Sequence, residues 1–329
     1  MFRLVTVIAC FICVSISSVS AQQASTPFSI RNLNPFIQIY GIPATEPAEL
    51  KTDQEWASAV ALDVANSSIL TRESNEAIIL DGETYRLSLT MRRGINSKTE
   101  LGVEVPLIAH SNGFMDNFIE GWHDTFGLTN AQRNKTTSNT LHYRYSVNNI
   151  NVFEIDNPNE GIGDIRIFAA RQLHRSANSA LSVHTSLKLP TGDAEKLHGS
   201  GAADLSVSLA HIKRNWLTTL QLSSFANGGV LLLGKGDVLS HLQKSALLFG
   251  STGLIWDQHE VIDLKAQLDF HSSVYNSGLN QLGNATVQLT IGGSVRLGSS
   301  TRLDVGIGEN LLTDTTPDFL INLVLKSNY

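Results

Sequence analysis

The strongest constraint on the fold of this chain is an alternation of apolar and polar residues that reaches its C-terminus. Side chains of an extended strand point to opposite faces with a period of two. In residues 319–329 the apolar face carries Phe319, Ile321, Leu323, Leu325, Ser327 and Tyr329. One such segment fits either an ordinary half-buried strand or a strand that faces lipid, so the choice depends on the rest of the chain.

The same alternation recurs through most of the sequence. Its clearest instance is 262–271, where Ile262 and Leu264 alternate with Asp263 and Lys265. Twelve segments are predicted as strands, of which 244–256 is apolar on both faces: 54–64, 85–92, 100–107, 164–170, 181–189, 204–209, 216–223, 244–256, 262–271, 286–297, 302–307 and 319–329. An even number of antiparallel strands can close a sheet and leave no edge in lipid. We therefore predict an all-β fold, a transmembrane up-and-down antiparallel β-barrel of about 12 strands over residues 54–329.

The connections between these segments support the barrel, because short and long connections alternate along the chain. The short ones are 174–178, 213–215, 257–259 and 298–300, and the longer ones are 191–201, 227–243, 273–283 and 308–318. Outer-membrane barrels keep short turns in the periplasm and longer loops outside. This rule puts the C-terminus in the periplasm and makes residues 110–162 one long extracellular excursion.

Composition limits the other possibilities. The chain of 329 residues is 42% apolar and 16% charged, too polar for a helical membrane protein and too apolar for disorder. Its net charge of −6, without a basic cluster, argues against nucleic acid as a partner.

The N-terminal 21 residues predict a cleavable signal peptide. Arg3 begins it, residues 4–14 form an apolar core, and Val19-Ser20-Ala21 supplies small residues for cleavage. Both cysteines, Cys10 and Cys13, fall within this peptide, so the mature chain is expected to have no disulfide and no thiolate metal site. Export and a membrane-facing barrel together predict the outer membrane of a Gram-negative bacterium.

Residues 22–53 form an irregular lead segment. It holds four of the eight prolines, Pro27, Pro35, Pro43 and Pro47, and proline blocks strand pairing. We expect a periplasmic linker; a plug inside the barrel, or a segment under its periplasmic mouth, is the alternative.

The excursion 110–162 predicts two local structures. Phe114, Phe118 and Trp122, with His123 beside them, have helical spacing within 113–126. Residues 141–147 and 150–155 predict a hairpin that turns at 148–149. We expect the helix to pack on the barrel mouth; insertion into the lumen and contact with the outer leaflet are alternatives.

The predicted inner face of the barrel is charged and nearly neutral overall. Its basic residues are Arg86, Arg92, Arg166, Lys188, Lys265, Arg296, Arg302 and Lys326. Its acidic residues are Asp63, Glu100, Glu104, Asp164, Asp204, Asp263, Asp269 and Asp304. Balanced charge favours cross-strand ion pairs, because buried charges need partners. A conducting polar channel is compatible with the same residues, since twelve strands can leave a narrow water path.

Several motifs carry a family resemblance. Asn34-Pro35-Phe36, the run 119–128 and Gly161-Ile162-Gly163-Asp164 together resemble a family of uncharacterised Gram-negative proteins, predicted outer-membrane barrels grouped under a domain of unknown function. Gly161–Asp164 followed by 189–193 is also similar to barrels associated with the meta-pathway of phenol degradation. The first resemblance implies an outer-membrane barrel, and the second implies a channel for hydrophobic or aromatic compounds. The same glycine and aspartate motifs also fit strand-entry turns.

These observations predict a passive pore or porin-like transporter for small molecules, and not an enzyme. A non-conducting barrel for adhesion, envelope structure or partner binding is the alternative. A third possibility is a lipid hydrolase that uses His110 and Ser111, which would have to meet although neighbouring strand residues point apart.

Glu120, His123 and Asp124 have the residue types of a metal site, but we expect them to form a solvated face of the helix. No cofactor is predicted. The expected partners are outer-membrane lipid, the insertion machinery that reads residues 319–329, and a small solute.

Overall fold

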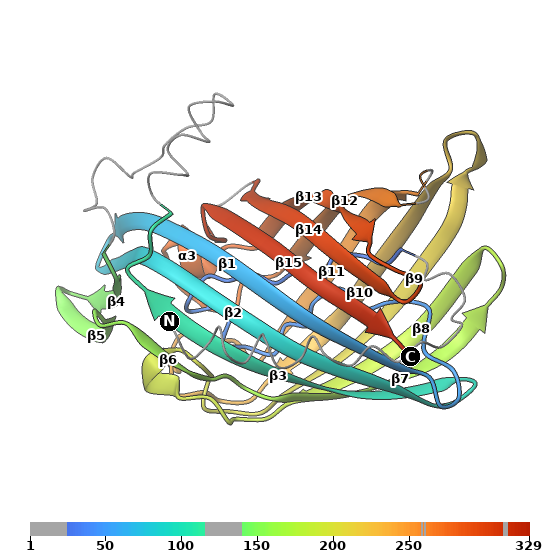
Figure 1. Ribbon diagram of the computed structural model, residues 1–329. Coiled ribbons are helices and arrows are strands. Elements are labelled where there is room, and N and C mark those ends of the chain that lie inside the picture. Colours follow the sequence, from blue (N-terminus) through green and yellow to red (C-terminus); the bar gives the residue numbers. More distant parts are fainter. Residues whose placement is uncertain (1–24, 116–139, 258, 260, 312–314) are drawn as a thin grey trace.

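The wall of the molecule is a closed antiparallel sheet (Figure 1). The computed structural model describes residues 25–115, 140–257, 259, 261–311 and 315–329. Twelve strands follow one another around the wall in chain order, and the last pairs with the first. They are β1 (Trp56–Glu73), β2 (Glu76–Asn96), β3 (Thr99–Ser111), β7 (Arg166–Arg175), β8 (Ser179–Lys188), β9 (Asp204–Leu217), β10 (Leu222–Leu233), β11 (Ala246–Trp256), β12 (Ile262–His271), β13 (Thr286–Arg296), β14 (Thr301–Asn310) and β15 (Phe319–Asn328). The predicted twelve-stranded barrel is confirmed.

The C-terminal strand closes the barrel. β15 pairs with β1 from Ala57↔Asn328 to Asn66↔Phe319. At the rim the Trp56 N–H donates to the Tyr329 carbonyl at 2.7 Å, and the Tyr329 N–H donates back at 3.0 Å. Because every wall strand has two neighbours, no strand edge of the wall is left for lipid to solvate.

The two faces of the wall separate apolar from polar side chains. Leu264 and Ile291 point outward and are 51% and 57% exposed, whereas Lys265 and Gln288 are each 3% exposed. Phe319 departs from the expected lipid-facing pattern: it is buried, in a cluster with Met115 of the external excursion.

The short turns lie at the end of the barrel that holds the C-terminus, called here the periplasmic end. One predicted turn, 213–215, is wrong. β9 continues to Leu217, and the chain reverses in a 3-10 turn, Thr218–Leu220. One of the polar residues that suggested a turn is instead used inside the barrel, because the Arg214 guanidinium binds Glu49.

The first hairpin is longer than predicted. β1 and β2 stay in register up to Glu73↔Glu76, so most of 65–84 is paired strand and not loop. Asn66 and Ser68 hide the alternation, since they are polar and buried.

The external excursion adds β4 (His142–Val147), β5 (Ile150–Ile155) and β6 (Asn159–Ile162). β4 and β5 form the predicted hairpin, which turns at Asn148 and Asn149 with positive φ angles of 52° and 64°. β4 extends the sheet along the outer part of β2, and β6 pairs with the end of β3.

The predicted loop helix is not seen in the part of 113–126 that the structure describes. Gly113–Met115 has no helical hydrogen bonding, and Phe114 is 66% exposed. Phe118, Trp122, His123, the rest of that helix and the signal peptide lie outside the described residues. None of the described helices is both long and apolar enough to cross a membrane.

Candidate functional site: the filled lumen

Residues 25–53 lie inside the barrel. In Figure 1 their dark-blue trace runs through the interior behind β1 and β2. The segment climbs from the periplasmic end to the extracellular end, turns, and descends again to β1. We call residues 25–53 the plug.

The ascending pass follows β12, β14 and β15. The Phe28 N–H donates to Gln267 Oε1 at 2.9 Å, and Asn322 Nδ2 donates to the Ser29 carbonyl at 3.0 Å. Phe28, Ile30 and Leu33 form a small apolar core with Ala65 and Leu320. The pass is therefore held by both hydrogen bonds and packing.

The plug turns at Asn34-Pro35-Phe36. Asn34 organises this turn: its Oδ1 accepts from the Phe36 N–H at 3.0 Å, and its carbonyl accepts from the N–H groups of Ile37 and Gln38. Its Nδ2 also donates to the carbonyls of external loops. The motif that carried the family resemblance thus shapes the tip of the plug.

The tip is buried in an apolar cluster that fills the extracellular half of the lumen, called here the outer seal. Tyr40 donates to Tyr275 Oη at 3.1 Å, and Tyr275 donates to the Phe36 carbonyl at 2.8 Å. The members of the outer seal include Phe36, Ile37, Ile39, Tyr40, Ile78, Leu80, Tyr143, Tyr145, Leu197, Leu231, Phe249, Tyr275 and Leu279. The barrel is closed to the outside by packed side chains from the plug, the wall and the loops.

The descending pass returns along β7–β9 and β11–β12. The Gly41 N–H donates to Asp204 Oδ2 at 2.8 Å, and Thr45 Oγ1 donates to Ser251 Oγ at 2.7 Å. Lower down, the Leu50 N–H donates to Gln172 Oε1 at 3.0 Å. A chain that lacks strand pairing must find partners for its N–H groups, and here the wall side chains supply them.

Ion pairs join the plug to the wall. Glu46 binds Arg92 at 2.5 Å and Arg166 at 2.7 Å. Arg31 binds Glu104 at 2.8 Å. Near the periplasmic end Glu49 accepts two hydrogen bonds from the Arg214 guanidinium, both at 2.8 Å. We call these pairs the latch.

A second set of ion pairs lies wholly within the wall. They are Arg86–Glu104, Arg92–Glu100, Arg166–Glu104, Lys188–Asp164, Lys188–Asp204, Lys265–Asp304, Lys326–Asp304 and Arg302–Asp263. The charged residues named from the sequence are therefore found at buried or half-buried positions, most of them in cross-strand pairs. Asp269 differs, because it accepts hydrogen bonds from Gln267 and Thr45. Arg296 is half-buried near the periplasmic end of β13.

The glycine and aspartate motifs form a strand-entry junction. Asp164 accepts from the Gly192 N–H at 2.8 Å and from the Ser200 N–H at 3.1 Å, and it binds Lys188 at 2.6 Å. A Cβ on Gly199 would lie 2.3 Å from the Asp164 carboxylate, so this close approach requires glycine. The motif holds the loop 189–203 against the wall.

His198, in that loop, lies against the inward-facing His110. The two rings stack at 5.8 Å between centroids, and His198 Nε2 is 2.7 Å from Asn159 Oδ1. Burial lowers the pKa of His198 below its usual value, because a buried imidazolium loses hydration.

His110 and Ser111, the proposed hydrolase pair, make other contacts. His110 Nδ1 is 3.0 Å from Thr84 Oγ1, and the Ser111 hydroxyl accepts from the Gly113 N–H at 3.3 Å. Neither is the histidine–serine hydrogen bond that a serine hydrolase needs.

Glu120, His123 and Asp124 lie outside the described residues. Within the described ranges, no three His, Cys, Asp or Glu side chains are grouped to hold a metal ion.

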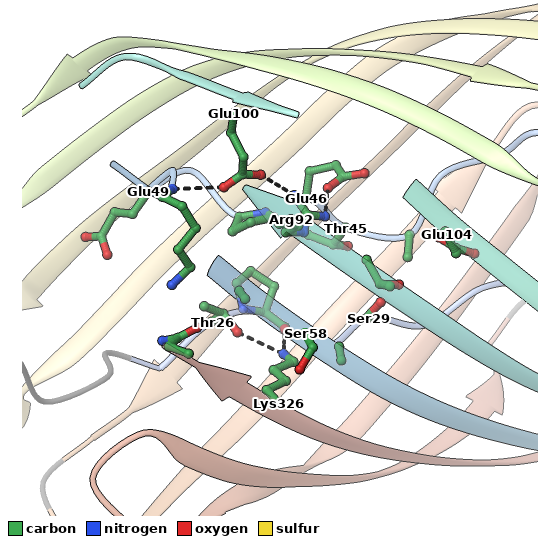
Figure 2. Close-up of a pocket in the computed structure, with 18 of the residues that line it drawn as sticks. Thr26, Ser29, Thr45, Glu46, Glu49, Ser58, Arg92, Glu100, Glu104 and Lys326 are labelled. Atoms are coloured by element: carbon green, nitrogen blue, oxygen red, sulfur yellow. Dashed lines mark hydrogen bonds and ion pairs between the residues drawn. The ribbon is translucent and has the colours of Figure 1, made fainter. Parts of the chain in front are cut away.

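A cavity of about 120 Å³ lies beside the latch, and Glu46, Glu49, Arg92, Glu104 and Arg166 of the latch line it. Figure 2 shows Glu46, Arg92 and Glu100 together on one side of it and Lys326 beside Thr26 on another. Both passes of the plug and strands β1, β2, β3, β7 and β15 line it. The sequence analysis did not identify the plug's contribution to this site, because a segment without alternation does not show which side chains share a face. The available signal was the presence of Arg31, Glu46 and Glu49 in a proline-rich stretch.

The fold and its lipid-facing belt define a transmembrane β-barrel of the outer-membrane type. The family model described as "Protein of unknown function (DUF3187)" matches residues 3–329, and the chain belongs to that family. This confirms the resemblance to an uncharacterised barrel family. A comparison with curated proteins found no match.

One solved structure supports the same fold. The COG4313 outer membrane channel from Pseudomonas putida F1 is 12% identical, with a TM-score of 0.55 over 87% of this chain and 100% of that one. The P. putida toluene transporter TodX is 11% identical, with a TM-score of 0.37 over 84% of this chain and 89% of that one. CymD, a monoaromatic hydrocarbon channel, is 10% identical, with a TM-score of 0.37 over 93% and 94%. At these identities a likeness concerns the fold alone.

Proposed function

We propose that this protein is a passive outer-membrane channel for small polar solutes, closed at rest by its own plug. Conduction begins when residues 25–53 leave the lumen. The observation that carries the proposal is the arrangement of the latch: Arg92, Arg166 and Glu104, three of its four wall residues, also have ion-pair partners within the wall.

The wall keeps ion-pair partners when the plug is withdrawn. Arg92, which binds Glu46, also binds Glu100, and Arg166, which binds Glu46, also binds Glu104. Withdrawal therefore exposes paired charges to water, which costs far less than a lone buried charge. A lumen of mixed sign suits polar solutes in general more than ions of one sign.

The path of the plug favours movement without damage to the wall. Its ascending pass starts beside Lys326, whose Nζ donates to Thr26 Oγ1 at 2.8 Å. Its descending pass ends where the Gln54 N–H donates to the Gly94 carbonyl at 3.1 Å. Both places belong to the periplasmic end, so the plug can leave as a loop through one mouth.

A reversible lock tests the proposal. Thr45 and Ser251 face each other at 2.7 Å between hydroxyl oxygens, and replacing both with cysteine places two sulfurs where a disulfide can form. Planar-bilayer conductance is measured for wild type, Thr45→Cys/Ser251→Cys and a deletion of residues 25–53. We expect brief openings for wild type, none for the oxidised double variant, recovery on reduction, and sustained openings for the deletion.

The matched controls are the single variants Thr45→Cys and Ser251→Cys, which cannot cross-link within the chain. Openings of wild-type size and frequency from the oxidised double variant would mean that the plug is not the gate. If wild type, the reduced double variant and the folded deletion variant all show no openings, the result would favour the non-conducting barrel. We propose no catalytic role; ester release by wild type and by Ser111→Ala should be equal and at background.

A further inference from the structure

The periplasmic cavity has the features of a ligand site, beginning with the space itself. Inward positions near the start of β1 are occupied by Ala57 and Ala59, which leave room between the wall and the plug. The cavity reaches the rim of the barrel, where Asn328 lines it. Its volume of about 120 Å³ is close to the ~150 Å³ of an apolar cavity that binds benzene.

The charges that line the cavity are matched with one exception. All four lining carboxylates are held by arginines: Glu46, Glu49, Glu100 and Glu104. Lys326 is also occupied, since its Nζ binds Asp304, Thr26 and the Pro27 carbonyl.

Lys51 is the exception among the described lining residues. Its backbone N–H donates to Glu100 at 2.8 Å, while its amine takes part in no hydrogen bond or ion pair with the described residues. The cavity is also lined by the apolar residues Pro27, Ala44, Pro47, Ala57 and Ala59. An ammonium that makes no hydrogen bond or ion pair, in a cavity with apolar residues in its lining, is complementary to an organic anion.

We propose that this cavity binds a small organic carboxylate with an apolar body of about six to eight non-hydrogen atoms, taken up from the periplasmic side. Its carboxylate pairs with the Lys51 ammonium, and its apolar body lies against the alanines of β1. The bound carboxylate touches both the ascending and the descending pass, so it stabilises the seated plug.

Binding is tested by calorimetry on the refolded, full mature chain with four ligands of matched size or charge. Benzoate has both features, benzylamine reverses the charge, benzyl alcohol removes it, and acetate lacks the apolar body. We expect benzoate to bind at least tenfold more tightly than each of the other three. Equal binding of benzoate and benzyl alcohol, or no heat with benzoate, would overturn the proposal.

Three variants locate the site. Lys51→Met should weaken benzoate binding at least tenfold, whereas Lys98→Met, which removes an exposed lysine from the nearby β2–β3 turn, should leave it unchanged. Ala59→Leu should abolish binding by filling the space. Circular dichroism checks that each variant keeps its strands. Unchanged binding by folded Lys51→Met would refute the assignment.

The effect on the plug has its own readout. Benzoate should slow hydrogen exchange at the amides of both Phe28 and Leu50, one on each pass, in wild type and not in Lys51→Met. If the plug is also the gate proposed above, benzoate on the periplasmic side should reduce the frequency of openings. That last effect rests on the proposed function, whereas binding and exchange protection do not, so the two proposals can fail separately.

Discussion

The outer and inner halves of the lumen are filled by the same segment in two different ways. In the outer seal, Phe36 meets Phe153 edge-on at 5.5 Å and Tyr40 meets Tyr275 at 5.7 Å. In the inner half the latch holds the plug by charge and leaves a cavity beside it. Apolar packing excludes water over its whole area, whereas ion pairs fix a position and tolerate space around them. The outer half therefore acts as the barrier and the inner half as the fastening.

Phe36→Ala should produce the largest change, because it removes a ring that is 0% exposed from the outer seal. Truncating a buried phenylalanine costs ~3–5 kcal/mol. We expect hydrogen exchange at residues 36–40 to accelerate by several orders of magnitude. Phe114→Ala, which removes an exposed ring outside the barrel, is the control. If the two variants exchange alike at 36–40, the outer half is not a packed barrier.

Glu46→Gln should loosen the inner half and leave the outer half intact. The change removes one carboxylate from two buried arginines, and breaking a buried ion pair costs about 3 kcal/mol, less here because both arginines keep a second partner. Faster exchange should be confined to residues 41–51. Glu195→Gln, at an exposed position, should change nothing. Equal acceleration at 36–40 would mean that the two halves move as one unit.

Acidification should destabilise the loop 189–203, in the outer half, through His198. Its pKa is lowered in the folded protein, so the unfolded loop binds a proton more readily and the folded loop loses stability as pH falls through about 6.5. Exchange in 189–203, corrected for intrinsic rates, should rise below that pH in wild type. His198→Gln should lack this pH-dependent component. A rise of the same size in both proteins would assign the effect to another group.

Arg144→Ala should have the smallest effect. Arg144 lies 3.8 Å from Glu154 on the external hairpin, and both side chains are about one-third exposed. Exposed ion pairs contribute ~0.5 kcal/mol or less. The thermal midpoint should stay within about 1 °C of wild type, and exchange in both halves of the lumen should be unchanged. A larger loss would connect the hairpin to the seal.

The wall could be predicted from the sequence because lipid outside and polar groups inside impose a period of two on every strand. That rule located most of the twelve strands. It misplaced the segment 216–223, which contains the turn Thr218–Leu220 and only the first two residues of β10. The segment 244–256 was its weakest instance, because both faces are apolar. The rule failed where a side chain contacts another part of the protein in place of lipid or water. Arg214 looked like a turn residue because its partner, Glu49, is far away in the chain.

The alternation rule could not identify the plug. Its buried residues follow no period, because each faces a different wall strand: Phe28 meets Gln267, Gly41 meets Asp204, and Leu50 meets Gln172. The prolines that favoured a linker have a use inside a barrel, since proline carries no N–H group that would need a partner there. Only the three-dimensional wall distinguishes a plug from a linker of the same composition.

The position of the plug at the start of the chain sets an order for assembly. Residues 25–53 are exported before any wall strand, yet their partners include Lys326, three residues from the end of the chain. Until β15 joins β1, part of the plug has nothing to bind. The contacts between the plug and β15 can therefore form only when the barrel closes, so the plug cannot be fully seated before the last strand is in place.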